Sequence, residues 1–462
     1  MIGAGPWRRI LRKVRPLRVV IDVRAMGDSS GGIQQWVIGL AAALSSLSHR
    51  SETYLFLANE GQGDWLRPYL GGRCKLVVQR KAVVATPATP TIVDREATPI
   101  AVPATPLPAR DARGRRRRSG LGARFPLLRT IRRRVLGRKP DAARPRRLSP
   151  FDETMRDLDA DVVHFPKQSA STTTLPNIYQ PWDLQHRHLP EFFSAEVLEQ
   201  RDATYRRYCA QATLIIVSTT WTKDDVAAEY GIAPERIVAI HPPPPTRVYV
   251  QPTPDVEDAI ATRLGLPARF ALYPALAWPH KNHERLFEAL GMLRDRGIEV
   301  PLVCSGHRND RYPALMQRAG ELGIESQVMF PGFLTEAEIQ VVYRRATMLI
   351  FPSLYEGGSF PILEAFAAGL PVACSNVTSL PALVGDAAIV FKPTDPAAIA
   401  AAVERLWFDD ARRAELVQRG RARVLQFDWD RTARLMRAHY RRIGSRRLSA
   451  AERRLLAAPP LV

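Results

Sequence analysis

The chain has 462 residues, of which 46% are hydrophobic, and this is enough to bury the cores of two or three domains. Its four cysteines lie far apart, which excludes a disulfide-rich framework and a cysteine zinc site and indicates a reducing compartment. The formal net charge is +20, but 16 basic residues and two aspartates between 110 and 147 supply +14, so the rest carries only +6 (20 − 14).

Residues 1–16 form a basic N-terminal tail without the apolar stretch of a signal peptide. The sequence also has no apolar run of about 18 residues, the minimum for a membrane-spanning helix. We therefore expect a cytoplasmic protein with neither a signal peptide nor a transmembrane helix.

Apolar segments alternate with helical patterns along the first half of the chain, which predicts α/β layering. The first strand is followed by Gly31-Gly32 and a helix that starts near Ile33. Another helix is predicted over 221–230. The predicted strands are 17–23, 53–58, 74–79, 160–165, 175–180, 214–218 and 236–241.

Residues 82–150 interrupt this alternation. Six prolines and five threonines lie between 82 and 108, and the basic run 110–147 follows. Such a composition cannot bury enough apolar surface to offset its ordering entropy, so we predict a largely disordered insertion. It is either a solvated loop or a peripheral contact to anionic membranes through 110–147. Nucleic-acid binding is disfavoured because Phe125 is the one aromatic residue of the basic run.

Four prolines at 242–245 predict a stiff connector, after which the alternation resumes. Strands are predicted at 270–274, 300–306, 327–332 and 348–352, and helices at 283–296, 312–322, 336–345 and 431–442. Ligands of parallel sheets bind beyond the carboxyl ends of the strands. Two such sheets therefore predict an active site in a cleft between them.

The stretch 351–375, FPSLYEGGSFPILEAFAAGLPVACS, carries the clearest chemistry. A strand leads through a Gly-Gly loop into a helix whose first turn holds Pro361, and we expect Glu364 in that turn and Glu356 in the loop. A glycine-rich helix entry binds phosphate well. Two neighbouring carboxylates suit sugar hydroxyls, so the stretch indicates a nucleotide-sugar site.

The Glu-x7-Glu spacing followed by Ala-Ala-Gly-Leu-Pro-Val resembles the signature of retaining glycosyltransferase family 4, also called glycosyltransferase group 1. The resemblance implies the GT-B fold, in which two Rossmann-like doubly wound domains face each other across a cleft. The domains expected are an N-terminal tail at 1–16, an acceptor-side domain at 17–245 that contains the insertion, a nucleotide-sugar domain at 246–430, and a C-terminal helix and tail at 431–462 that cross back.

The resemblance also implies roles for residues of the second domain. Glu364 would hold the ribose hydroxyls, and Glu356 would hold hydroxyls of the transferred sugar. Lys281 would neutralise the departing diphosphate. The phosphate would be surrounded by the loop amides of Gly357, Gly358 and Ser359. Leu276 departs from the family pattern, since many relatives have an arginine five residues before this lysine.

In the first domain, Gly31 and Gly32 resemble the loop that approaches the donor phosphate. The segment 175–194 resembles a subgroup with a His-Asp-Leu-Gln-His stretch, in which Trp182 replaces the first histidine and Asp183 is kept. His186 is the candidate for contacting sugar or acceptor, the alternative being a structural histidine.

Two further patterns contain residue types that can bind a metal ion. The pair His186 and His188 has no cysteine or acidic cluster beside it, and Asp159-x-Asp161 stands where short acidic turns are common before a strand. We interpret neither as a metal site.

We thus expect retaining transfer of a hexose from a nucleoside-diphosphate sugar, GDP-mannose first, to a glycan or lipid-linked acceptor in surface polysaccharide assembly. No metal or other cofactor is expected. Two alternatives stay open. One is a glycoside hydrolase that uses Glu356 and Glu364, and the other is a non-catalytic protein that binds membranes or nucleic acid through the basic insertion.

Overall fold

The computed structural model describes residues 15–26, 31–47, 51–79, 148–245 and 249–462. The predictions for the tail before Arg15 and for the insertion up to residue 147 lie outside the described residues. The predicted insertion ended at residue 150, but the structure shows that Ser149 and Pro150 are ordered. The Ser149 side chain accepts a hydrogen bond from the Asp152 amide, and Pro150 begins a helix.

The first half of the chain forms a seven-stranded parallel sheet in the order β3-β2-β1-β4-β5-β6-β7. Val20 of the first strand pairs with Leu55 on one side and Val163 on the other. Apart from the edge strand β3, the strands are almost continuously buried, as in parallel sheets covered on both faces. They are β1 (Leu17–Asp22), β2 (Glu52–Asn59), β3 (Cys74–Gln79), β4 (Val162–Phe165), β5 (Asn177–Trp182), β6 (Leu214–Val217) and β7 (Ile237–Ala239).

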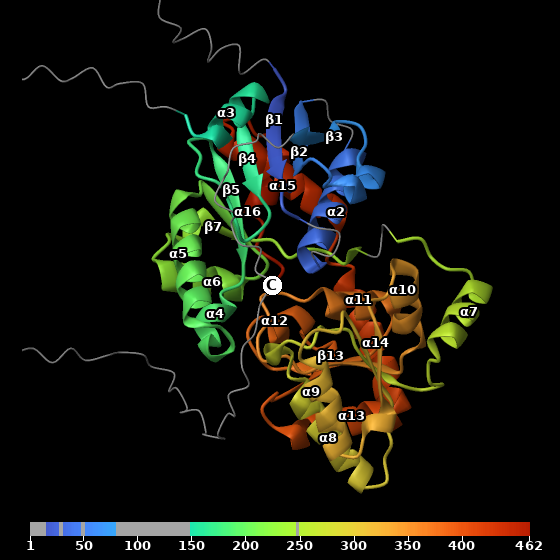
Figure 1. The fold of residues 1–462 in the computed structure, drawn as a ribbon. Helices are drawn as coiled ribbons and strands as arrows, with labels where there is room; N and C mark the ends of the chain where they lie inside the picture. The colour runs from blue at the N-terminus through green and yellow to red at the C-terminus, as the bar shows by residue number, and fades with distance from the viewer. Residues whose placement is uncertain (1–14, 27–30, 48–50, 80–147, 246–248) are drawn as a thin grey trace, which may run out of the picture. The chain divides into compact units, whose positions relative to one another are not determined.

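Helices connect these strands and cover the sheet (Figure 1). The longest, α5, has a polar surface and was not predicted. The helical elements are α2 (Gly31–Ser46), η1 (Asp64–Tyr69), α3 (Pro150–Asp157), α4 (Gln185–His188), η2 (Pro190–Phe192), α5 (Ala195–Gln211), α6 (Thr220–Tyr230) and η3 (Pro234–Arg236).

The second half forms a six-stranded parallel sheet in the order β10-β9-β8-β11-β12-β13. Its strands are β8 (Ala271–Tyr273), β9 (Leu302–Ser305), β10 (Val328–Gly332), β11 (Met348–Phe351), β12 (Val372–Ser375) and β13 (Ala388–Phe391). Its helical elements are α7 (Pro254–Leu264), η5 (Pro279–Lys281), α8 (His283–Asp295), α9 (Tyr312–Glu321), η6 (Glu325–Gln327), α10 (Glu336–Arg345), α11 (Phe360–Ala368), α12 (Leu380–Val384), α13 (Pro396–Phe408) and α14 (Asp410–Val424).

The chain then returns to the first sheet through α15 (Trp429–Ile443) and α16 (Ala450–Ala457), drawn in red in Figure 1. Trp429 packs against Trp36 of α2, with ring centroids 5.6 Å apart. The Tyr440 hydroxyl lies 2.8 Å from Nδ1 of the buried His164 in β4. The helix α15 thus packs into the core around the seven-stranded sheet, although it follows the six-stranded sheet in the chain.

Candidate active site

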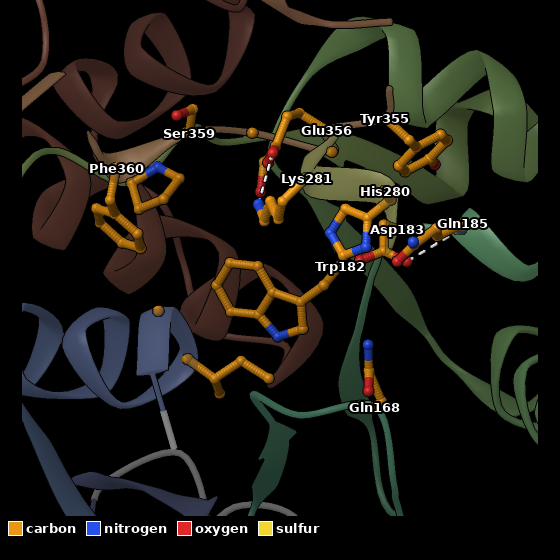
Figure 2. A pocket seen from close by; sticks show the side chains of 16 residues that line it. Gln168, Trp182, Asp183, Gln185, His280, Lys281, Tyr355, Glu356, Ser359 and Phe360 are labelled. Carbon is orange, nitrogen blue, oxygen red and sulfur yellow. Dashed lines mark hydrogen bonds and ion pairs between the residues drawn. The ribbon is translucent and has the colours of Figure 1, made fainter. Parts of the chain in front are cut away.

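A pocket of about 230 Å³ lies where loops from the carboxyl ends of both sheets meet (Figure 2). The second sheet contributes Lys281 after β8 and the segment 355–360 after β11. The first sheet contributes Trp182 and Ser218, at and after the ends of β5 and β6. The remaining lining residues are Gly32, Ile33, Gln168, Asp183, Gln185, Pro242 and His280.

A lysine and a glutamate are paired in this pocket. Lys281 Nζ donates to Glu356 Oε1 at 2.6 Å, and the two side chains are 19% and 9% exposed. The Glu356 carbonyl accepts hydrogen bonds from Thr378 Oγ1 at 2.7 Å and Ser379 Oγ at 2.9 Å. These bonds fix the loop after β11, so the Glu356 carboxylate is held facing the Lys281 ammonium group.

The two glycines of that loop allow the halves of the chain to approach closely. A Cβ on Gly357 would lie 2.7 Å from the carbonyl oxygen of Trp182, and one on Gly358 would lie 2.9 Å from Cβ of Ser218. Such distances are shorter than van der Waals contact, so a side chain would force the two loops apart. The hydroxyl of Thr222 in α6 also donates to the Gly357 carbonyl at 3.3 Å.

Backbone amides at the start of α11 point to an anion site. Within the described residues, the N–H groups of Gly357, Gly358 and Ser359 donate to no protein acceptor. Ser359 is the N-cap, and its hydroxyl accepts from the Ile362 amide at 3.5 Å. Unpaired amides at a helix N-terminus are the groups that bind phosphate oxygens.

Glu364 does not lie in the first turn of the helix, where the sequence analysis placed it. Phe360 begins α11, so Glu364 is the fifth helical residue and lies beyond the first turn. The residues that line the pocket do not include it, and its Oε2 instead accepts from the Tyr343 hydroxyl at 2.8 Å. Burial raises the pKa of this carboxyl to about 7.

Trp182 and Asp183 form the wall of the pocket opposite the second sheet. Trp182 has φ +70°, a strained conformation for a bulky residue, and its indole N–H donates to the Pro166 carbonyl at 2.9 Å. Burial raises the pKa of the Asp183 carboxyl, and the nearby Glu356 carboxylate adds to the rise. A second carboxyl thus lies near the Lys281–Glu356 pair.

His186 lies in the core of the first domain. Its ring packs edge-on against Tyr205 with centroids 5.1 Å apart, and Nε2 is 3.4 Å from the Tyr230 hydroxyl. Burial lowers its pKa to about 4. The pocket lining does not include it, which favours the structural-histidine alternative over a sugar-contacting role.

The predicted loop of the first domain is only partly at the pocket. Gly32 lines it and would place a Cβ 3.3 Å from the Phe360 ring, whereas Gly31 is outside the lining. His188 pairs with Asp225 at 2.8 Å.

Both aspartates of the Asp159-x-Asp161 pattern form ion pairs with arginines. Asp159 pairs with Arg18 and Asp161 with Arg15. The described part of the chain holds no group of three or more His, Cys, Asp or Glu side chains placed to bind a metal ion.

Comparison with known proteins agrees with this architecture. Residues 261–423 match the family model described as glycosyl transferases group 1. These residues form a group 1 glycosyltransferase domain. The chain is 28% identical over 272 residues to the Escherichia coli O-antigen chain mannosyltransferase B, covering 55% of this chain and 70% of that one. It is 32% identical over 181 residues to the E. coli serotype-specific mannosyltransferase WbdA, covering 38% of this chain and 22% of that one.

The fold of the chain is GT-B, as predicted. A sucrose-phosphate synthase from Thermosynechococcus elongatus superposes with a TM-score of 0.63 at 17% identity, covering 93% of this chain and 99% of that chain. The superposition covers most of the chain, and the chain's two parallel sheets are those expected of this fold.

Several residues that line the pocket were not predicted from the sequence. Tyr355 directly precedes Glu356, and its hydroxyl accepts from the Leu184 amide at 3.1 Å. Gln168 and Ser218 come from loops without a motif, and their position after strand ends was the one available signal. His280, which directly precedes Lys281, also lines the pocket, and burial keeps its pKa well below the usual value.

Proposed function

We propose that the protein transfers a hexose from a nucleoside-diphosphate sugar to an acceptor hydroxyl, with retention at the anomeric carbon. The observation that carries the proposal is the set of loop amides at Gly357, Gly358 and Ser359, which have no acceptor in the described part of the chain and lie close to the Lys281–Glu356 pair. A diphosphate needs such donors and a cation, and a sugar needs hydrogen-bond acceptors.

The proposed mechanism assigns each group one task. The loop amides hold the phosphate that carries the sugar, and Lys281 neutralises the charge that develops as the nucleotide leaves. When Lys281 turns to the phosphate, the Glu356 carboxylate becomes free to accept hydrogen bonds from sugar hydroxyls. The departing phosphate takes the proton of the acceptor hydroxyl on the same face, so no side chain forms a covalent bond with the sugar.

GDP-mannose is our proposed donor, because the two E. coli relatives are named mannosyltransferases. The proposed acceptor is a glycan or lipid-linked sugar. We propose that no metal is needed, since Lys281 and the amides supply the charge stabilisation, and a chelator should leave the rate unchanged. No described helix is long and apolar enough to cross a bilayer. Membrane contact through 110–147 remains a prediction.

A glycoside hydrolase is less well supported. Such an enzyme places two carboxyl groups about 5 Å apart, or somewhat further, on either side of the bond it cleaves. Glu356 faces the pocket, whereas Glu364 bonds to Tyr343 outside the lining, so these two do not flank one space.

The test is a thermal-shift screen with UDP, GDP, ADP and GDP-mannose on the wild type and on Lys281→Met. A ligand at 100 times its Kd stabilises by about 2.7 kcal/mol. We expect GDP and GDP-mannose to stabilise the wild type, Lys281→Met to lose most of the shift, and the exposed Lys392→Met of the same domain to keep it. No shift with any nucleotide, or release of free sugar from an oligosaccharide without nucleotide, would overturn the proposal.

A further inference from the structure

Three charged side chains cluster at the carboxyl edge of the seven-stranded sheet. Asp22 ends β1, and Lys167 follows the neighbouring strand β4. Arg24 holds Asp22 with two hydrogen bonds, from Nε to Oδ1 and from Nη2 to Oδ2, both at 2.9 Å. Lys167 Nζ lies 3.7 Å from the same Oδ1 and donates to the Arg24 carbonyl.

The charges of this cluster do not balance. Among the described residues, Asp22 is the one carboxylate that pairs with either cation, so two positive charges share one negative charge. Asp22 is 1% exposed, and the Arg24 and Lys167 side chains are 21% and 12% exposed. An uncompensated cation at this depth is costly unless a further anion reaches it.

The cluster adjoins the pocket on the side away from the donor groups. Gln168, next to Lys167, lines the pocket, and Figure 2 shows it apart from Lys281 and Glu356, beyond the Trp182 ring. The Pro166 carbonyl holds that ring in place. Arg24 is braced from behind, since it donates to Gln79 at 3.3 Å and lies 4.9 Å above the Phe151 ring. Asp22, Arg24 and Lys167 are not among the lining residues themselves, but Lys167 directly precedes Gln168, so the cluster lies next to this side of the pocket.

We propose that Lys167 and Arg24 bind an oxyanion of the acceptor, a phosphate or a carboxylate, and so select acceptors that carry a negative charge. The inference rests on the proposed transferase function, because it assigns this half of the pocket to the acceptor. Within the described residues, the bonds of Arg24 to Asp22, Gln79 and Ser171 leave one N–H at Nη1. The oxyanion takes this N–H and those of Lys167 as charge-assisted hydrogen bonds, with Gln168 beside it. Asp22 stays as the group that positions both cations.

The test is a titration of inorganic phosphate and, separately, acetate into protein saturated with GDP, so that the amides at Gly357–Ser359 are already occupied. Binding is measured by calorimetry. We expect saturable binding of at least one anion to the wild type, at least tenfold weaker binding to Lys167→Met, and recovery in Lys167→Arg. The exposed Lys75→Met, from the same domain, should bind like the wild type.

Lys167→Met leaves the Asp22–Arg24 pair intact, so it should fold, and unchanged GDP affinity verifies this. The same titration with a phosphorylated prenyl lipid in detergent micelles, and with empty micelles as the blank, shows whether the protein binds a phosphate carried by a lipid as well as free phosphate. Binding of either source that depends on Lys167 supports the inference. If GDP binds but no anion binds saturably, or Lys167→Met binds anions like the wild type, the inference fails while the transferase proposal stands. If no nucleotide binds, the transferase proposal is the one that fails.

Discussion

The carboxyl of Glu364 titrates near neutral pH because it is buried beside tyrosines. Tyr343 of α10 donates to it, and Tyr249 lies near it, with Glu336 near that tyrosine. Its pKa rises from 4.5 to about 7 on folding, so the stability linked to its proton is present below pH 4.5 and lost as the pH rises through 7.

We therefore expect Glu364→Gln to stabilise the ligand-free protein at pH 8, by about 1–3 kcal/mol, and to have little effect at pH 4.5. Gln keeps an acceptor for the Tyr343 hydroxyl. Urea unfolding at the two pH values measures the difference. An equal change at both values would show that the carboxyl is not perturbed.

The ion pair of Lys281 and Glu356 has a consequence for stability as well as for the proposed chemistry. Removing Lys281 leaves the buried Glu356 carboxylate without its ion-pair partner, and we expect Lys281→Met to destabilise by about 1–3 kcal/mol. The double variant with Glu356→Gln should recover part of the loss. A double-mutant cycle in urea gives the coupling energy, and additive effects would mean that the pair is only a surface contact.

Residue roles could be predicted only where a local motif carried them. The string around Glu356 and the lysine before α8 gave two residues that the structure places 2.6 Å apart. The polar segment at 182–188 offered no way to decide which side chains face the pocket. Packing of α5 and α6 against it turns His186 to the core, and that contact depends on residues far along the chain.

Among the elements, the loop between β11 and α11 needs glycines because it packs closely against Trp182 and Ser218. Gly357→Ala would press a methyl group against the Trp182 carbonyl, and Gly358→Ala would press one against Ser218. We expect each variant to lower kcat/KM by at least tenfold while the folded state persists. Gly71→Ala is the matched control, because its Cβ would meet ordinary contact at 3.8 Å. Circular dichroism checks that each variant is folded, and kinetic assays measure kcat/KM. A folded variant with unchanged kcat/KM would contradict this expectation.

The elements themselves followed from the sequence to different extents. All the predicted strands exist within a few residues, because buried parallel strands read as continuous apolar runs. The 17-residue α5 was missed because it buries only Tyr205 and Cys209, which leaves little apolar periodicity. The start of α3 was placed in the insertion because a serine cap before Pro150 also resembles loop composition.

At the scale of the whole molecule, the last helix joins the end of the chain to its beginning. The family resemblance predicted that this helix crosses back, but not how it is held. Glu52 of β2 is 2% exposed and pairs with Arg437 at 2.9 Å and with Arg441 at 2.5 Å. Glu452 of α16 pairs with the same two arginines. Residues some 390 positions apart form this network, so no local pattern reveals it.

This network makes the docking of α15 sensitive to acid. Burial alone would raise the pKa of Glu52, but hydrogen bonds from Arg437 and Arg441 outweigh it and lower the pKa below 4.5. The stability that Glu52 contributes is therefore present above pH 4.5 and lost as the pH falls through the lowered value. We expect Glu52→Gln to cost about 3 kcal/mol at pH 7, because it leaves buried arginines short of a partner, and to cost less at pH 3.

Asp64→Asn is the matched control, since its pair with Arg67 is exposed and should contribute less than 1 kcal/mol. Calorimetric unfolding at pH 7 and pH 3 checks the prediction, with hydrogen exchange on α15 as the local readout. If Glu52→Gln and Asp64→Asn change the stability equally, the ion network does not hold the helix. The apolar contact of Trp429 with Trp36 would then be what binds the end of the chain to the first domain.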